Sequence, residues 1–159
     1  MRVMVGVTIG VGLVVASFAG AHATSMQGGE WAVTMQMGAQ DEQPIVRKLC
    51  YTSDMPVNDK FISAQLQNAM QKMSATCDKP DIQISGSTVT TALVCKFQQM
   101  TISTKSKMTF DGDSAYHQDS QTHIDNPMNG MPAEMAMSQD GKRLGPCQPG
   151  DKQMPDLSK

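Results

Sequence analysis

Methionine is the residue type whose abundance and spacing could support chemistry in this sequence. The chain has 15 methionines among 159 residues but only 4% aromatic residues. Six of them form two groups: Met35 and Met37, then Met128, Met131, Met135 and Met137. Residues two apart on a strand point to the same face about 7 Å apart, and soft thioether ligands suit Cu(I). If the two Met-x-Met segments were neighbouring strands, their sulfurs could converge on one Cu(I) or Ag(I) ion.

The same methionines also fit a structural role, which we favour over metal binding. Trp31 and Val33 have the same parity as Met35 and Met37, so one strand face would carry all four. Methionine fills irregular cores, and its flexible side chain adapts to varied contacts. The sequence therefore predicts a Met-lined apolar face that packs in the core or contacts an unknown protein or a small apolar ligand.

Two histidines lie beside acidic residues on a polar segment. His117, Asp119, His123 and Asp125 have the same parity, so they would share one face of a strand. The two histidines are roughly 20 Å apart along an extended strand, so they cannot bind one metal ion from the same straight strand. A hydrated sheet edge is the simpler interpretation.

Sequence patterns typical of enzymes are missing from this chain. It has no G-x-S-x-G motif and no plausible serine with a nearby base. Asp111-Gly112-Asp113 resembles the start of a calcium loop, but Ala115, Tyr116 and Thr122 occupy the later positions that such a loop needs for ligands and glycine. The formal net charge of −2 gives no basic excess for nucleic acid. We therefore expect a noncatalytic protein with no cofactor and no nucleic-acid partner.

The N-terminal segment has the features of a secretory signal peptide. Arg2 precedes an uncharged apolar stretch that ends in Ala21-His22-Ala23, an A-x-A cleavage pattern. We expect residues 1–23 to be removed near Ala23, which would place the protein in a Gram-negative periplasm or outside the cell, with no transmembrane segment. The remaining chain would form a single exported β-rich domain over residues 24–147 and a flexible polar tail over residues 148–159.

Four cysteines fit the oxidising environment of an exported protein. Cys50, Cys77, Cys95 and Cys147 lack the close spacing of a zinc site, so two disulfides are expected and three pairings are open. We favour Cys77–Cys95, which would close a local hairpin. Cys50–Cys147 would then tie the C-terminal end to an early strand.

Hydrophobic periodicity predicts several strands and one helix. Strands are expected at residues 30–37, 45–51, 81–85, 89–95, 100–110, 115–124 and 133–138. Turns are expected at Gly86-Ser87, at Asp111-Gly112-Asp113 and at Asp140-Gly141. An apolar stripe predicts an amphipathic helix at residues 57–74, capped by Asn58 or Asp59; the stripe comprises Ile62, Leu66, Ala69, Met70 and Met73.

These elements predict a mostly β (α+β) fold. The sheet would be a strongly curved antiparallel meander with the amphipathic helix packed on it and two disulfides. The pattern leaves open whether the sheet closes into a barrel.

Several of these motifs together resemble one bacterial family. They are Gly29-Glu-Trp31-x-Val33-x-Met35-x-Met37, the Cys50 strand end, Phe110-Asp-Gly-Asp113, Met135-x-Met137 and Gly141-Lys-Arg-Leu-Gly145-Pro-Cys147. In this order they resemble the domain of unknown function 3617 family, small exported proteins mainly of Gram-negative bacteria, from about Gly28 to Cys147. Lys142 and the polar stretch of residues 115–125 depart from the family pattern. The resemblance implies a location and a β-rich disulfide-bonded module, and it supplies no catalytic residue.

Overall fold

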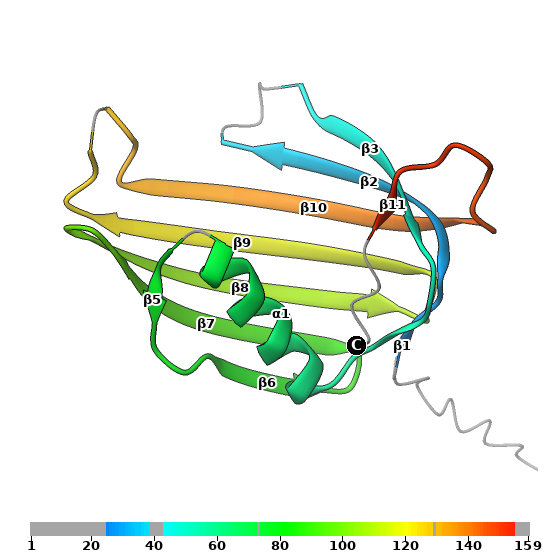
Figure 1. Cartoon of the computed structure of the whole chain (residues 1–159), viewed down its shortest axis with the longest axis horizontal. Coiled ribbons are helices and arrows are strands. Elements are labelled where there is room, and N and C mark those ends of the chain that lie inside the picture. The colour runs from blue at the N-terminus through cyan, green and yellow to red at the C-terminus, as the bar shows by residue number, and fades with distance from the viewer. Residues whose placement is uncertain (1–24, 39–42, 73, 129, 155–159) are drawn as a thin grey trace, which may run out of the picture.

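The protein folds as a strongly curled sheet, a half-barrel, with one helix among the residues described (Figure 1). The computed structural model describes residues 25–38, 43–72, 74–128 and 130–154. The helix is α1 (Asp59–Lys72). The strands are β1 (Ser25–Met26), β2 (Gly29–Met37), β3 (Ile45–Tyr51), β4 (Met55–Pro56), β5 (Thr76–Cys77), β6 (Asp81–Ser85), β7 (Thr88–Phe97), β8 (Met100–Asp111), β9 (Ala115–Asp125), β10 (Glu134–Gly145) and β11 (Gln153–Met154). The predicted fold class, mostly β with one helix, is confirmed.

The main sheet is a meander whose last long strand returns to the first. Its order is β11-β3-β2-β10-β9-β8-β7-β5, and β6 also pairs with β7. Strands β7 to β10 follow one another as antiparallel neighbours, and β10 then pairs antiparallel with β2. The N-terminal and C-terminal parts of the domain are therefore joined in the middle of the sheet. The edges of this sheet are formed by β11 and by β5 with β6, so it stays open.

The prediction of a turn at Asp140-Gly141 is wrong. Both residues lie inside β10, a continuous strand of 12 residues. Gly141 is the cross-strand partner of Tyr116, and a Cβ atom at Gly141 would come within 2.0 Å of the Tyr116 ring. Glycine is required here because an aromatic ring covers the backbone, and no chain reversal is involved.

The hydrophobic core lies at one end of the half-barrel. Trp31 is fully buried between Tyr51 and Tyr116, with ring centroids 6.5 and 5.9 Å away. Val33 and Phe110 are also buried in this cluster. The Trp31 Nε1 atom donates a 2.9 Å hydrogen bond to the carbonyl of Gln27, which satisfies its polar atom within the core.

Helix α1 lies across the inner face of the sheet but packs on it loosely (Figure 1). It starts after Asn58, whose Oδ1 atom accepts a 2.8 Å hydrogen bond from the backbone N–H of Phe61, as an N-cap residue does. Of its 14 residues none is fully buried. The sheet-facing stripe includes Ile62, Leu66 and Met70, which are half-buried. Ala69 is exposed, and the predicted stripe residue Met73 lies outside the described residues.

The cysteines form the two disulfides that the sequence predicted. Cys50 bonds to Cys147 and Cys77 bonds to Cys95. Disulfides persist in oxidising compartments, so both are compatible with a periplasmic or extracellular location.

The expected signal peptide, residues 1–23, lies outside the described residues. Within the expected tail, β11 pairs in parallel with Cys50 and Tyr51 of β3. In the described part of the chain, no helix is long and apolar enough to span a membrane.

Candidate ligand-binding site

A cavity of about 630 Å³ lies between α1 and the inner face of the sheet. Its walls come from α1, from the segment that follows it and from strands β7, β8 and β9. The lining residues are Leu66, Met70, Ala75, Thr91, Leu93, Cys95, Phe97, Met100, Ile102, Thr104, Ser106, Gln118, Ser120 and Met131. Small-molecule sites typically have 300–1,000 Å³ and mostly apolar walls with a few polar groups. This cavity has both properties.

A second, smaller cavity of about 220 Å³ continues toward the hydrophobic core. It shares Leu66, Thr91, Ser106 and Gln118 with the larger cavity. Its other walls include Phe110 and further apolar residues of β4, α1 and β8. We call the two cavities the outer lobe (about 630 Å³) and the inner lobe (about 220 Å³), and the four shared residues the waist.

On the inner face of the sheet, cross-strand partners in β7, β8 and β9 form rows, and the polarity of the side chains changes from one row to the next. At one end, Phe110 pairs with Tyr116, and at the other Cys95 pairs with Ile102 and Ile102 with Ile124. Three rows lie between them. One comprises Val89, Met108 and Gln118, and the other two carry hydroxyl groups: Thr91, Ser106 and Ser120, and Leu93, Thr104 and Thr122. The site is therefore apolar at both ends and polar in the middle.

The hydroxyl groups of these middle rows pair with one another. Thr91 Oγ1 lies 2.8 Å from Ser106 Oγ, and Thr104 Oγ1 lies 3.1 Å from Thr122 Oγ1. A hydroxyl has one donor and two acceptor sites. Each pair uses one donor and one acceptor, which leaves hydrogen-bonding capacity for a ligand.

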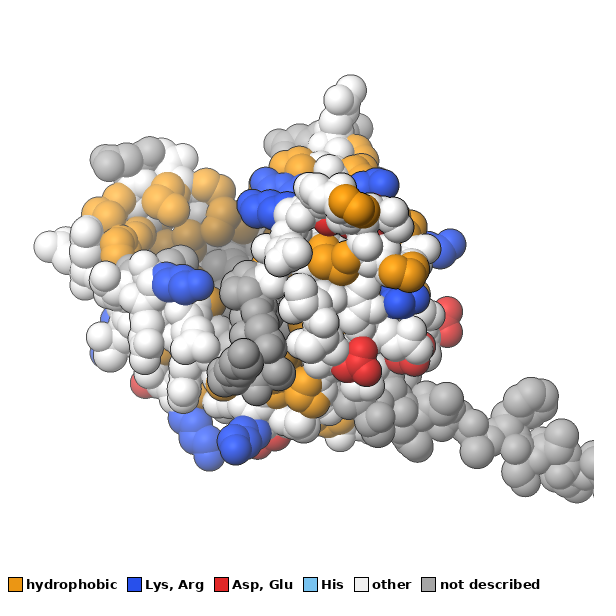
Figure 2. Space-filling model, turned by 45° about the vertical axis from the view of Figure 1, so that its right-hand side comes forward, with side chains coloured by type: hydrophobic (Ala, Val, Ile, Leu, Met, Phe, Trp, Pro, Cys, Tyr) orange, Lys and Arg blue, Asp and Glu red, His pale blue; other side chains and the backbone are white. Residues whose placement is uncertain are grey.

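The outer lobe reaches solvent at the end where β2 finishes and β10 begins. Met131 lines the lobe and is 43% exposed, so it marks the boundary between cavity and solvent. Met37, Ile45 and Met135 are also exposed at this end. Figure 2 shows hydrophobic side chains gathered at the corresponding left-hand end of the molecule. An apolar ligand could therefore enter past an apolar rim.

The Cys77–Cys95 disulfide borders the outer lobe. Cys95 Sγ lies 3.5 Å from Met70 Sδ of α1, and both residues line the cavity. The disulfide also joins β7 to β5, shortly after the C-terminal end of α1. It thus fixes the sheet under one end of the helix.

Four of the six methionines expected as metal ligands share one face of the β2–β10 pair. Met37 is the cross-strand partner of Met137, and Met35 and Met135 lie two residues from them on the same face. Met128 and Met131 lie in the connection between β9 and β10. Met35 packs against the core cluster, whereas Met37 is 51% exposed.

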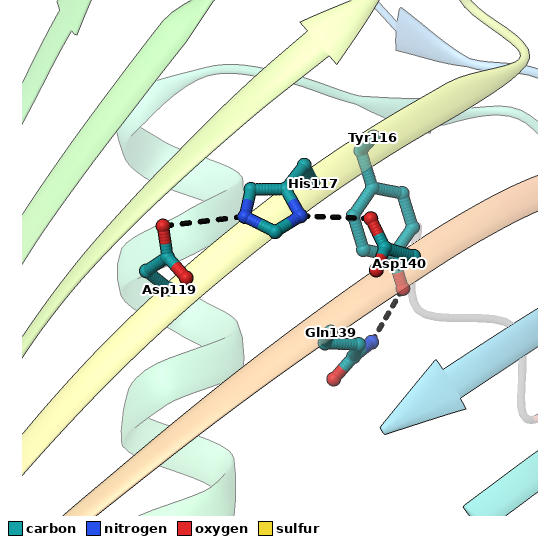
Figure 3. A network of polar contacts seen from close by, with 5 residues as sticks. All are labelled: Tyr116, His117, Asp119, Gln139 and Asp140. Carbon is teal, nitrogen blue, oxygen red and sulfur yellow. Dashed lines mark hydrogen bonds and ion pairs between the residues drawn. The ribbon is translucent and has the colours of Figure 1, made fainter. Parts of the chain in front are cut away.

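The histidines lie on the face of the sheet opposite the cavity. The expected sheet edge is wrong, because β9 pairs with β8 on one side and with β10 on the other. His117 Nδ1 is 2.7 Å from Asp140 Oδ1, and His117 Nε2 is 3.2 Å from Asp119 Oδ2 (Figure 3). His123 is placed in the same way between Glu134 and Asp125. Each histidine thus contacts a cross-strand acid of β10 and the acid two residues further along β9.

These acids raise the pKa of both histidines. The pKa of His117 is raised because its ring donates hydrogen bonds to Asp140 and then to Asp119, and the pKa of His123 is raised because its ring donates to Glu134 and Asp125. Neither histidine lines the cavity. The described residues contain no group of three His, Cys, Asp or Glu side chains that could hold a metal ion.

Tyr116 points to the other side of β9 from His117 and is part of the inner face (Figure 3). Its hydroxyl accepts a hydrogen bond from the Gln139 side chain. Burial raises the pKa of Tyr116 to about 12, so it stays uncharged at physiological pH.

Sequence reasoning placed the apolar face on β2, but most of the cavity is lined by α1, β7 and β8. Leu93, Met100 and Ile102 were not expected to line a site, and Leu66 and Met70 were expected only to pack on the sheet. A signal was available in β8, where Thr104 and Ser106 interrupt an inward face that is otherwise apolar. Buried hydroxyl groups need hydrogen-bond partners, so hydroxyl residues at inward positions indicate a polar surface inside the half-barrel.

Comparison with known proteins gives one match. The model of a family described as "Protein of unknown function (DUF3617)" matches residues 26–147. No curated protein and no solved structure matches the chain.

Proposed function

Because the chain belongs to the DUF3617 family of proteins of unknown function, we propose its function from its own geometry. It is a noncatalytic periplasmic protein that binds a small apolar ligand between α1 and the inner face of the sheet. The observation that carries this proposal is the outer lobe of about 630 Å³. Its walls are mainly apolar, and it opens beside Met131.

The loose packing of α1 supports a binding role. An amphipathic helix normally buries its apolar stripe against the core, but no residue of α1 is fully buried. Leu66 and Met70 face the cavity, so part of the helix stripe contacts empty space where sheet side chains would otherwise lie. A ligand in this space would complete the apolar burial of the helix.

The lining also supports a noncatalytic role. Among the described residues that line the two lobes there is no Asp, Glu, His, Lys or Arg, and Cys95 is held in a disulfide. The exposed His–acid pairs lie on the other face of the sheet. The periplasmic location is supported by the two disulfides and by the signal-like N-terminal pattern.

Binding can be tested with N-phenyl-1-naphthylamine, a probe whose fluorescence rises in apolar surroundings. We expect saturable binding to the wild-type protein. Leu66 lines both lobes, so the larger indole of Leu66→Trp should occupy part of the cavity at the waist and weaken probe binding at least tenfold. Filling a cavity generally preserves or raises stability, so the melting temperature should not fall.

Asn68→Trp is the matched control because Asn68 is an exposed residue of the same helix and lines neither lobe. It should bind the probe as the wild type does. Absence of saturable binding to the wild type, or equal binding by Leu66→Trp, would refute the proposed function.

A second candidate function, binding of Cu(I) or Ag(I), is supported by the Met37–Met137 pair. Side chains of directly opposed residues have Cβ atoms about 4.5–5.5 Å apart. Met35 and Met135 flank this pair on the same face. Four flexible thioethers can therefore reach one another beside the open end of the half-barrel.

Native mass spectrometry with Ag(I), a redox-stable substitute for Cu(I), tests this candidate. Stoichiometric uptake at low micromolar silver should be lost when Met35, Met37, Met135 and Met137 are all replaced by Leu, which preserves size and apolarity. Replacing Met26, Met55 and Met108 by Leu provides a control away from the cluster. No uptake, or uptake that survives the fourfold replacement, counts against metal binding.

A further inference from the structure

We propose that the ligand is an uncharged amphiphile with an internal carbonyl group at the waist and an apolar segment in each lobe. This inference rests on the proposed function and adds the chemical class of the ligand. Its basis is the position of Thr91, Ser106 and Gln118, which line both lobes. A ligand that occupies both lobes must pass these three polar side chains.

The waist can recognise a carbonyl oxygen. The Thr91 and Ser106 hydroxyls are 2.8 Å apart, and after that contact one O–H hydrogen remains available to donate. The carboxamide of Gln118 contributes further donors. A pure hydrocarbon would cover these groups without replacing their hydrogen bonds to water, which is unfavourable.

The surroundings of the waist exclude a charged group. No charged residue stands among the described residues that line either lobe, so a carboxylate or ammonium held there would be desolvated without a partner. Carbonyl groups of amides or esters avoid this cost.

The flanking walls require apolar segments on both sides of the polar group. The inner lobe is lined by Met26, Val89 and Phe110, and the outer lobe by Leu93, Met100 and Ile102. A ligand with its polar group at one end could fill only one lobe while satisfying the waist. The two lobes therefore favour a ligand whose polar group lies within its hydrocarbon chain and not at one end.

The test is displacement of N-phenyl-1-naphthylamine by three compounds with equally long main chains: N-hexylheptanamide, tetradecane and tetradecanoate. We expect the amide to bind about tenfold more tightly than the other two, as one retained hydrogen bond would give. In Thr91→Val/Ser106→Ala, this advantage should largely disappear. Because both partners of the hydroxyl pair are removed together, the fold should tolerate the change.

Thr104→Val/Thr122→Val is the matched control, since it removes the second hydroxyl pair and leaves the waist intact. It should retain the preference for the amide. If the probe binds but the amide shows no advantage, or if the advantage survives in Thr91→Val/Ser106→Ala, this inference is overturned while the proposed function stands. If the probe itself does not bind to the wild type, the proposed function fails and the inference with it.

Discussion

At the scale of single residues, the two histidines form a pH-sensitive part of the outer surface. Each contacts two acids, and these contacts raise its pKa. A group with a raised pKa in the folded state stabilises the fold below its unfolded pKa of about 6.5, and this contribution is lost as the pH rises through the folded pKa. Both side chains are half-exposed, so solvent screens the effect.

We therefore predict that the melting temperature falls by a few degrees or less as the pH rises from below 6.5 through the raised pKa values. The double variant His117→Gln/His123→Gln should show a smaller fall, because glutamine retains a hydrogen-bonding group but does not titrate. Thermal melts of both proteins in buffers that span this pH range measure the difference. Identical pH profiles would show that these pairs do not contribute.

Gly141 is a second residue whose role follows from its immediate contacts. Its backbone lies under the Tyr116 ring, and a Cβ atom would come 2.0 to 2.7 Å from three ring atoms. Tyr116 packs against Trp31 and Phe110, so the ring cannot move without disturbing the core. We predict that Gly141→Ala destabilises the protein by about 1–3 kcal/mol, the usual cost of overpacking.

Denaturant unfolding measures this loss. The neighbouring residue Lys142 is exposed on the same strand, so Lys142→Ala is a suitable control and should change the free energy of unfolding by about 0.5 kcal/mol or less. Equal effects of the two substitutions would contradict the proposed contact.

At the scale of elements, alternation and turn residues predicted the long strands and the helix. Strands β2, β3 and β6 to β9 lie where their periodicity placed them, and α1 starts within two residues of the expected position. The two-residue strands β1, β4, β5 and β11 were missed because they are too short for a periodic signal. The true extent of β10 was missed because glycine after aspartate ordinarily indicates a turn.

The disulfides connect elements at very different separations in the chain. Cys77 and Cys95 are 18 residues apart, whereas Cys50 and Cys147 are 97 residues apart. A disulfide stabilises mainly by restricting the unfolded chain, and the effect grows with loop length. We predict losses of about 3 kcal/mol for Cys77→Ala/Cys95→Ala and about 4.7 kcal/mol for Cys50→Ala/Cys147→Ala.

Chemical denaturation under nonreducing conditions compares these two double variants with the wild type. The larger loss is expected for the Cys50–Cys147 pair. A larger loss for the Cys77–Cys95 pair would indicate that packing around Met70 contributes more than restriction of the unfolded chain.

At the scale of the whole molecule, the motif Gly141-Lys-Arg-Leu-Gly145-Pro-Cys147 closes the domain. Arg143 Nε donates a 2.7 Å hydrogen bond to the carbonyl of Gly28, which directly precedes β2. Gly145 O would lie 2.2 Å from a Cβ atom at Gly29, so the two backbones approach closely. Cys147 then bonds to Cys50 of β3. The motif joins the two ends of the domain. Its disulfide to Cys50 was predicted from the cysteines, but the contact of Arg143 with Gly28 was not, because the pairing of β10 with β2 leaves no local sequence signal.

The cavity was likewise beyond prediction from periodicity alone. Leu66 and Met70 were predicted to face the sheet, and they do. A helical stripe shows which side faces inward but not how far the sheet lies beneath it. That separation depends on the curl of the whole sheet and on the positions of β5 and β6 at its edge.

The position of α1 over the cavity makes a last prediction about the whole molecule. A helix with no fully buried residue loses little by opening locally, so its amides should exchange faster than those of β8 and β9. A ligand that fills the outer lobe would contact Leu66 and Met70 and add apolar burial to the helix. Saturation with N-phenyl-1-naphthylamine should therefore slow hydrogen exchange in residues 59–72 much more than in the central strands.

Hydrogen exchange followed by mass spectrometry resolves these segments. The Leu66→Trp variant provides the control, because the larger side chain should obstruct the probe and so reduce the effect of adding it on exchange in α1. Uniform slowing over the whole chain would mean that the probe stabilises the fold globally, and slowing confined to β2 and β10 would place the binding site at the methionine cluster. Only protection centred on α1 agrees with a ligand held between the helix and the sheet.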